Sequence, residues 1–390
     1  MRHGRWWGLA SAMLMALGLS GCTGFVARQI EKPGRSDQKQ MAPFRQMLEQ
    51  AGLHYDTMRT AQGVRIAYWH GLPRDYGATQ VASEQRRAGH VSFHVDFHFR
   101  ALKKAAPLPV RGSIVLLHPW GTEGSAMAGW GLAFASAGYV VVMPDLRSQG
   151  RSDDAPVGYG PREAGDMVSL VHALEATHRL PGPLYLLGAS YGATVALFTA
   201  PRLPEVHGVI ALEPYADAVN VIHRAPASGL FGYRWLVRWI SSHEMDEAIA
   251  RADRVLGIDL YRIDPGEALA RTKVCTLILG GNHDELIPPS ALRALARRSP
   301  KARYVEIAGE GHLTLPLRTD RLFPPMLKWI DGLPAGPDGD CPGYMPLPPT
   351  AVPVPHVRSK IAGDRGAARA LSLQSPSPLG RGEGPWMALL

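Results

Sequence analysis

The chain has 390 residues, a length that fits one large domain with appended segments or two small domains. Hydrophobic residues make up 46% and charged residues 19%, which is ordinary for a globular protein. The formal net charge is +8, without a dense Lys/Arg block interleaved with aromatic residues, which argues against nucleic acid as a partner. A modest attraction to anionic lipid stays open. Three cysteines form neither a disulfide framework nor a metal-binding pattern.

The N-terminus reads as a targeting segment. A short basic start, Met1–Arg5, precedes an apolar stretch from Trp6 to Leu19, and the segment ends Leu19-Ser20-Gly21-Cys22. This apolar stretch is too short for a confident transmembrane span, so residues 1–21 are predicted to be a signal peptide. The last four residues resemble the lipobox of bacterial lipoproteins, and this resemblance implies cleavage before Cys22.

In that family the thiolate of the cysteine accepts a diacylglyceryl group, and the new N-terminus is acylated. Acyl chains on Cys22 would hold the protein at a membrane without a spanning helix. Thr23 follows the cysteine, and the lipoprotein sorting pattern favours the outer membrane where Asp is absent there. We expect a lipid-anchored protein of the bacterial cell envelope, on the periplasmic face of the outer membrane. An ordinary signal peptide, or an uncleaved anchor with an incidental Cys22, is the alternative.

Composition shifts divide the rest of the chain. Residues 22–62 are polar and mixed and are interpreted as a tether and N-terminal segment, with a short helix around Pro43–Ala51. Residues 63–333 form the predicted main domain, in which residues 215–270 interrupt the rhythm as a small helical cap. Residues 334–390 are rich in Pro, Gly and Ser and are predicted to be a largely disordered tail.

The main domain alternates apolar strands with helical stretches. Val64–Trp69 and Val91–Phe99 come first and alternate in polarity, as half-buried strands do. Six short, continuously apolar segments follow: Ser113–Leu117, Tyr139–Met143, Leu184–Leu187, Val206–Leu212, Val274–Leu279 and Arg303–Ile307. Continuously apolar strands that alternate with helices indicate a parallel sheet covered on both faces. The expected fold class is therefore α/β with a mostly parallel central sheet.

A Gly-x-Ser-x-Gly motif occupies residues 188–192. An apolar strand precedes it and an Ala-rich helical stretch follows it, which is the context that the motif requires. Glycine is needed at both flanks because a side chain would collide within the sharp turn, and a helix that begins after Ser190 brings a positive dipole end to it. The motif resembles the nucleophile turn of α/β-hydrolases, and the resemblance implies that Ser190 is the nucleophile.

The resemblance also implies a base and an acid in two later loops. His312 follows the last apolar strand, behind Gly309 and Gly311, and Asp284 follows the preceding strand, four residues before Pro288. The chain order Ser, Asp, His is that of the α/β-hydrolases. In the implied mechanism the histidine takes the serine proton, and the aspartate orients and stabilises the imidazolium.

Other carboxyls compete with Asp284 for the role of the acid. Glu285 is its neighbour, and Glu213 and Asp217 follow an earlier strand. The position of Asp284 favours it over these three.

The oxyanion hole is expected after the strand Ser113–Leu117. His118-Pro119-Trp120-Gly121 resembles the His-Gly-x-Gly loop of α/β-hydrolases, with proline in place of the first glycine. Two N–H donors must face the oxyanion. Tyr191, directly after the nucleophile, is expected to supply one, and Trp120 the other, because Pro119 has no N–H. His118 is interpreted as a residue that braces this loop.

No metal or cofactor is expected. His94, Asp96 and His98 share one face of a strand, but we interpret them as a solvated face opposite apolar residues. Cys275 lies in an apolar strand and is interpreted as a small buried hydrophobe. It would be an awkward partner for Cys341 in the tail, although a pairing in an oxidising compartment stays open.

The sequence predicts a serine hydrolase that cleaves a small-molecule or lipid ester through an acyl-enzyme intermediate. A serine peptidase or an acyltransferase of the same fold would use the same three residues. A non-catalytic envelope lipoprotein that retains the fold is the alternative outside enzymes. The sequence leaves acyl specificity and oligomeric state open.

Overall fold

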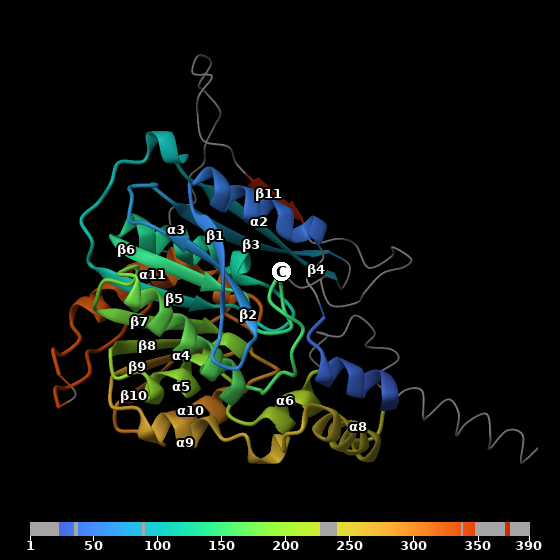
Figure 1. The fold of residues 1–390 in the computed structure, drawn as a ribbon. Coiled ribbons are helices and arrows are strands. Elements are labelled where there is room, and N and C mark those ends of the chain that lie inside the picture. The colour runs from blue at the N-terminus through green and yellow to red at the C-terminus, as the bar shows by residue number, and fades with distance from the viewer. Residues whose placement is uncertain are drawn as a thin grey trace, which may run out of the picture.

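The computed structural model describes residues 23–34, 38–87, 90–226, 240–336, 338–347 and 371–374 (Figure 1). The predicted signal peptide and Cys22 lie outside these residues. The centre of the molecule is an eight-stranded sheet in the order β1-β2-β6-β5-β7-β8-β9-β10. Its strands are β1 (His54–Arg59), β2 (Arg65–Gly71), β5 (Gly112–Leu117), β6 (Tyr139–Pro144), β7 (Leu184–Ala189), β8 (Val206–Leu212), β9 (Thr276–Gly281) and β10 (Ala302–Ile307).

The sheet confirms the predicted fold class. β5 to β10 form an unbroken parallel array, and β1 and β2 add antiparallel strands at one edge. All six of the predicted continuously apolar segments are strands of this array. Every residue of β5, β6, β7 and β9 is buried, which explains why these segments are apolar throughout rather than alternating.

Helices cover both faces of the sheet (Figure 1). In β5, Val115 and Leu117 belong to the core on one face, while Ile114 and Leu116 belong to the core on the other. The first core contains residues of α4 (Pro161–Ala176), α5 (Tyr191–Thr199), α6 (Ala218–Arg224), α8 (Ser242–Leu256), α9 (Pro265–Arg271) and α10 (Pro289–Ala296). The second contains residues of α2 (Gln38–Gln50), α3 (Ala128–Ser136) and α11 (Thr319–Asp331).

A second, smaller sheet contains one of the two predicted early strands. β3 (Thr79–Arg87) and β4 (His90–His98) form an antiparallel pair, and β11 (Leu371–Gln374) extends it beside β4. Val91–Phe99 is a strand, as predicted, but it lies outside the main sheet, where β2 pairs with β1. Polarity alternation identifies a strand but not the ladder that it joins.

The N-terminal segment is more ordered than a tether. Residues 23–31 form a helix whose side chains Val26, Ala27 and Ile30 are buried. α2 buries Met41, Met47 and Leu48 on one side, and β1 already belongs to the main sheet. The isolated apolar residues of this polar stretch are spaced for helix faces, and their burial ties the segment to the domain.

The segment predicted to be a cap lies between β8 and β9 in the sequence. It contains the helices α6 and α8, which pack beside each other. Ser241 Oγ caps α8 by accepting a hydrogen bond from the Glu244 N–H, and the Glu244 carboxylate accepts one from the Ser241 N–H. This reciprocal arrangement satisfies two free donors at the helix start. α9, also within the predicted cap, packs instead against α5 and α10.

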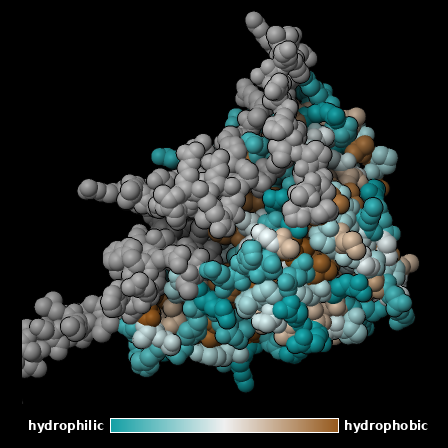
Figure 2. Space-filling view, turned by 180° about the vertical axis from the view of Figure 1, so that it is seen from behind, coloured by the Kyte–Doolittle hydropathy of each residue, from teal (hydrophilic) through white to brown (hydrophobic). Residues whose placement is uncertain are grey.

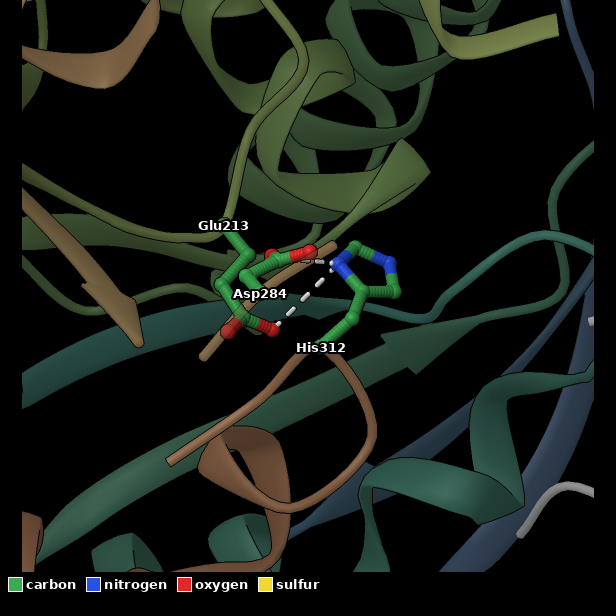
Figure 3. A group of neighbouring side chains, drawn as sticks. All are labelled: Glu213, Asp284 and His312. Atoms are coloured by element: carbon green, nitrogen blue, oxygen red, sulfur yellow. Dashed lines mark hydrogen bonds and ion pairs between the residues drawn. The ribbon is translucent and has the colours of Figure 1, made fainter. Parts of the chain in front are cut away.

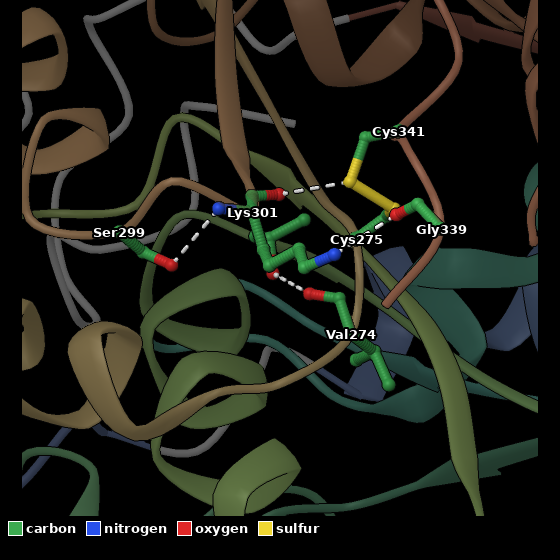
Figure 4. The surroundings of a disulfide bond; sticks show 7 residues. Val274, Cys275, Ser299, Lys301, Gly339 and Cys341 are labelled. Carbon is green, nitrogen blue, oxygen red and sulfur yellow. Dashed lines mark hydrogen bonds between the residues drawn. A yellow bond between two sulfur atoms is a disulfide. The ribbon is translucent and has the colours of Figure 1, made fainter. Parts of the chain in front are cut away.

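Part of the predicted disordered tail packs on the domain (Figure 4). Cys341 forms a disulfide with Cys275, and the Lys301 ammonium donates to the Gly339 carbonyl at 2.9 Å. The Arg321 side chain donates to the Leu347 carbonyl at 2.7 Å. Cys275 is buried, as predicted, and the pairing with Cys341 that the sequence leaves open is formed. Cys275 directly precedes β9, and Cys341 Sγ lies 3.5 Å from the carbonyl of Lys301, which directly precedes β10. Sequence periodicity does not reveal such a long-range contact.

From behind, the described residues form a mostly hydrophilic face with scattered hydrophobic spots (Figure 2). The large exposed apolar residues include Leu72, Val110, Val255 and Met345, and isolated residues of this kind are normal on soluble proteins. None of the helices within the described ranges has the length and apolar character needed to cross a membrane.

We expect reduction of the Cys275–Cys341 bond to destabilise the folded domain. The bond closes a loop with a sequence separation of 66 residues, for which the loop-closure model gives about 4 kcal/mol of unfolding free energy. Chemical denaturation with and without dithiothreitol measures the loss. The Cys275→Ser/Cys341→Ser double variant is the control and should not respond to the reductant. An equal loss of stability in the wild-type protein and the double variant on reduction would contradict the Cys275–Cys341 disulfide.

Candidate functional site

The turn after β7 holds Ser190 in an unusual backbone conformation. Ser190 has φ +50° and ψ −115° and lies directly before the first residue of α5. Its N–H donates to the Leu212 carbonyl at 2.8 Å, which fixes the turn to the end of the neighbouring strand β8. A non-glycine residue at positive φ costs about 1–3 kcal/mol. The turn projects Ser190 from the carboxyl end of the sheet, as the strand-turn-helix motif requires.

The two glycines of the motif are required by the backbone around them. A Cβ at Gly188 would collide with the carbonyl of Gly192, within the turn itself. A Cβ at Gly192 would collide with the carbonyl of Leu117, at the end of β5. The second contact shows that α5 begins directly against the strand that leads into the predicted oxyanion loop.

The structure brings Ser190, His312 and Asp284 into one hydrogen-bonded row. Ser190 Oγ lies 2.9 Å from His312 Nε2, and His312 Nδ1 lies 2.9 Å from Asp284 Oδ2. The Asp284 side chain is fully buried, and the His312 side chain is 11% exposed. Because a carboxylate only accepts, Nδ1 carries the ring proton of the neutral histidine, and Nε2 is the nitrogen that accepts from the serine hydroxyl.

Backbone donors orient the Asp284 carboxylate. Its Oδ1 accepts from the N–H groups of Leu286 and Ile287, each at 2.8 Å, which leaves Oδ2 to face His312. The loops that carry the acid and the base are also bonded to each other. The His283 N–H donates to the Glu310 carbonyl at 2.9 Å.

A buried ion pair holds the loop that carries His312. Glu310 accepts from the Arg321 guanidinium of α11 at 3.0 Å, and the same guanidinium donates to the Ala308 carbonyl. Arg318 lies 3.7 Å from Glu310. The helix α11 thereby fixes both ends of the short segment that precedes His312.

Glu213 is a second carboxyl at His312 (Figure 3). Its Oε2 lies 3.5 Å from His312 Nδ1, and its side chain is fully buried. Burial raises the pKa of the Glu213 carboxyl well above its usual value, and the neighbouring Asp284 charge raises it further. Sequence reasoning had treated Glu213 as a rival of Asp284. In the structure both carboxyls face the same ring nitrogen.

The side chains of the two residues predicted to supply the oxyanion donors pack against each other. The rings of Trp120 and Tyr191 pack with their centroids 4.8 Å apart. Among the hydrogen bonds of the described residues, none uses the N–H of Trp120 or that of Tyr191. Tyr191 is the first residue of α5, so its N–H has no acceptor within the helix.

The loop after β6 braces the Trp120 loop. His118 Nε2 accepts from the Leu146 N–H at 2.9 Å, and its Nδ1 lies 2.8 Å from the Pro119 carbonyl. Gln149 Oε1 accepts from the Gly121 N–H at 2.7 Å. Complete burial lowers the pKa of His118 to about 4, so this ring is neutral at ordinary pH. These contacts fit the bracing role that the sequence predicts for His118.

The N-terminal helical segment adjoins the same loop. The Tyr159 hydroxyl donates to the Ile30 carbonyl at 2.8 Å, and the Tyr159 ring packs on Trp120 at 5.3 Å and on Tyr191 at 5.9 Å. The carbonyl of Pro33 lies 3.1 Å from the position that a Cβ on Gly121 would take. The start of the described chain therefore packs beside the candidate site, a contact that no motif in the sequence indicates.

Together these groups provide a hydroxyl, a ring nitrogen that accepts its proton, a buried acid behind that ring and two backbone N–H groups without an acceptor among the described residues. This combination is suited to acyl transfer, in which the hydroxyl attacks a carbonyl and N–H donors hold the resulting oxyanion.

Comparison with known proteins agrees with this interpretation of the fold. A family model described as "Alpha/beta hydrolase family" matches residues 114–323, more than half of the chain.

The chain belongs to the alpha/beta hydrolase family. It is 26% identical over 255 residues to a pimeloyl-[acyl-carrier protein] methyl ester esterase, found in two strains of Xanthomonas oryzae pv. oryzae. The match covers 57% of this hydrolase-family chain and 96% of that esterase.

Solved structures of similar fold include a complex of DcsB with its substrate analogue, at 16% identity and a TM-score of 0.50. That match covers 73% of this chain and 100% of DcsB. An esterase from Pyrococcus furiosus matches at 15% identity with a TM-score of 0.49, over 73% of this chain and 91% of that one. These are similarities of fold.

Glu213, Asp284 and His312 also have ligand atoms within 4.8 Å of one another, as a metal site would require. In the structure Asp284 Oδ2 and His312 Nδ1 face each other at hydrogen-bond distance, and His312 Nε2 faces Ser190. The contacts of this cluster therefore match proton transfer from Ser190 to His312.

We expect Gly192→Ala to lower both stability and activity. The added methyl group would push the start of α5 away from Leu117, at a cost of about 1–3 kcal/mol in unfolding free energy, and would displace the Trp120 loop. Thermal unfolding and ester hydrolysis measure the two effects. Gly165→Ala in α4 is the matched control, because the nearest atom to its Cβ would be 3.5 Å away. A Gly192→Ala protein with wild-type stability and activity would refute this account of the turn.

Proposed function

We propose that this alpha/beta hydrolase is a serine hydrolase that cleaves carboxylic esters through an acyl-enzyme intermediate on Ser190. The observation that carries the proposal is the row Ser190–His312–Asp284, with both of its hydrogen bonds at 2.9 Å. The similarity to a methyl ester esterase supports ester cleavage over the other reactions of the fold.

In the proposed reaction, Ser190 Oγ attacks the ester carbonyl while its proton passes to His312 Nε2. Asp284 stabilises the imidazolium through Nδ1–H. The N–H groups of Trp120 and Tyr191 donate to the oxyanion of the tetrahedral intermediate. His312 then gives its proton to the leaving alcohol. A water molecule repeats the sequence on the acyl-enzyme, releases the carboxylic acid and restores the Ser190 hydroxyl.

We predict that a fluorophosphonate probe labels the wild-type protein and does not label Ser190→Ala. The same variant should lose at least about 10⁴-fold in ester hydrolysis, because the nucleophile is absent. Ser169→Ala is a matched control on the same domain, since Ser169 lies in α4 and donates to a helix carbonyl. Equal labelling of wild type and Ser190→Ala would disprove the proposed nucleophile.

The type of bond that is cleaved is tested by comparing p-nitrophenyl esters with aminoacyl anilides. Esters of increasing acyl length also show the preferred length of the acyl chain. We expect turnover of the esters. A preference for the anilides would instead identify a serine peptidase. Transfer of the acyl group to an added alcohol in preference to water would identify an acyltransferase. An absence of turnover and of probe labelling would favour the non-catalytic lipoprotein.

We further propose that acylation of Cys22 holds the protein on the periplasmic face of the bacterial outer membrane. The leader sequence supports this proposal, and so does the Cys275–Cys341 disulfide, since such bonds persist in oxidising compartments. The helix of residues 23–31 follows Cys22 directly and packs beside the candidate site through Ile30 and Tyr159. A lipid on Cys22 would therefore keep the site close to the membrane surface and favour lipid esters as substrates.

Cys22→Ala should move the protein from the membrane fraction to the soluble fraction without changing hydrolysis of a water-soluble ester. Membrane fractionation and metabolic labelling with an alkyne fatty acid measure anchoring directly. Cys341→Ala is the control for loss of a cysteine and should remain membrane-bound. Unchanged fractionation and unchanged fatty-acid labelling of Cys22→Ala would contradict the anchor.

A further inference from the structure

Four neighbouring parallel strands each deliver one residue to the candidate site, and Glu213 is the member without an assigned role. Ser190 follows β7, Glu213 follows β8, Asp284 follows the β9 turn and His312 follows β10. The carboxyl ends of adjacent parallel strands meet at one edge of the sheet, so the four side chains converge. The catalytic triad of a serine hydrolase needs only the serine, one carboxyl and the histidine.

The backbone holds Glu213 in place at an energetic cost. Its φ is +53°, a left-handed conformation that is uncommon for non-glycine residues. Its N–H donates to the Leu279 carbonyl at 2.7 Å, which joins it to the end of β9. Glu213 Oε1 accepts from the Gly281 N–H at 3.3 Å. Strain retained at a buried titratable residue beside the candidate site points to a role there.

The surroundings of Glu213 Oε2 indicate a protonated carboxyl. This oxygen is buried and, among the described residues, has no hydrogen-bond donor as its partner, because the His312 Nδ1 proton already faces Asp284. Its charged and titratable neighbours are Asp284, His312 and the more distant Glu310, and Glu310 is paired with Arg321. Two adjacent buried carboxylates are strongly unfavourable, and sharing one proton removes the repulsion. An oxygen of each carboxyl and a ring nitrogen of His312 lie within 4.8 Å of one another, which is close enough for such sharing.

We propose that Glu213 is a positioning residue that shares one proton with Asp284, so that the pair presents a single negative charge to His312. With Asp284 intact, the Glu213 O–H donates to the Asp284 carboxylate and helps to hold it. When the Asp284 charge is removed, Glu213 ionises and accepts the Nδ1–H of His312 across the present 3.5 Å. This inference rests on the proposed serine hydrolase function.

The decisive experiment compares ester hydrolysis by Asp284→Asn and by Asp284→Asn/Glu213→Gln. In a triad with one acid, the Asp-to-Asn change costs about 10⁴-fold. Here we expect Asp284→Asn to lose less than about 10³-fold and the double variant to lose at least tenfold more. Glu213→Gln alone should keep most of the activity, because its amide can still donate to Asp284, whereas Glu213→Leu should lose at least tenfold. Equal rates for Asp284→Asn and the double variant would overturn the proposal.

Stability gives a readout that does not depend on activity. The raised pKa keeps Glu213 protonated in the folded protein. In the unfolded chain the same carboxyl has its ordinary pKa, near 4.5, and loses its proton above that pH. The contribution of Glu213 to the free energy of unfolding is therefore complete below that pH. It falls as the pH rises toward the raised pKa of the folded state. Relative to Glu213→Gln, the wild-type unfolding constant should rise about tenfold per pH unit over this window. A difference that stays constant above pH 6 would show an ionised Glu213 and overturn the shared proton.

The two proposals fail in distinguishable ways. If wild type hydrolyses no ester and Ser190→Ala labels like wild type, the proposed function fails, and the pH dependence of stability still reports on the protonation of Glu213. If wild type is active and Glu213→Gln changes neither the Asp284→Asn background nor the pH dependence of stability, the inference about Glu213 fails alone.

Discussion

The positive-φ turn at Ser190 is the constraint on which the site depends. A serine can occupy it only because the flanking glycines leave room for two backbone segments, the start of α5 and the end of β5. The close approach at Gly192 sets the first turn of α5 against the loop that contains Trp120. The position of the nucleophile and the position of the predicted oxyanion donors are therefore fixed by the same contact. The strands β5 and β7, which are buried on both faces, provide the packed base that stabilises the strained turn at the end of β7.

The parallel sheet supplies the remaining geometry. Because β7, β8, β9 and β10 are consecutive neighbours, their carboxyl ends place Ser190 and Asp284 within hydrogen-bond distance of His312, and the Glu213 carboxyl 3.5 Å from the same ring. Polar contacts beyond the sheet then fix each loop. Backbone donors hold Asp284, the Glu310–Arg321 pair holds the segment before His312, and His118 holds the loop before Trp120. Proton chemistry at the site thus depends on contacts that are mostly buried and local to this edge.

Much of this arrangement could be predicted from the sequence because its signals are local. Continuous apolar runs identify buried parallel strands, and the loops that follow them carry Ser190, Asp284 and His312. Long-range pairing could not be predicted in the same way. Alternation in Val91–Phe99 indicates a strand but not the separate sheet that it joins, and nothing near Cys275 indicates that Cys341 lies beside it. Glu213 was recognised as a rival acid, but only the adjacency of β8 and β9 reveals that it faces His312 together with Asp284.

The most direct test of the central claim is to trap the acyl group on the protein. Wild-type protein is mixed with a p-nitrophenyl ester, quenched in acid within milliseconds to seconds, digested and analysed by mass spectrometry, with Ser190→Ala treated in parallel. We predict an acyl adduct on the peptide that contains Ser190, formed with stoichiometric release of p-nitrophenol and absent from the variant. An acyl adduct on another residue, or ester turnover that persists in Ser190→Ala, would contradict the account.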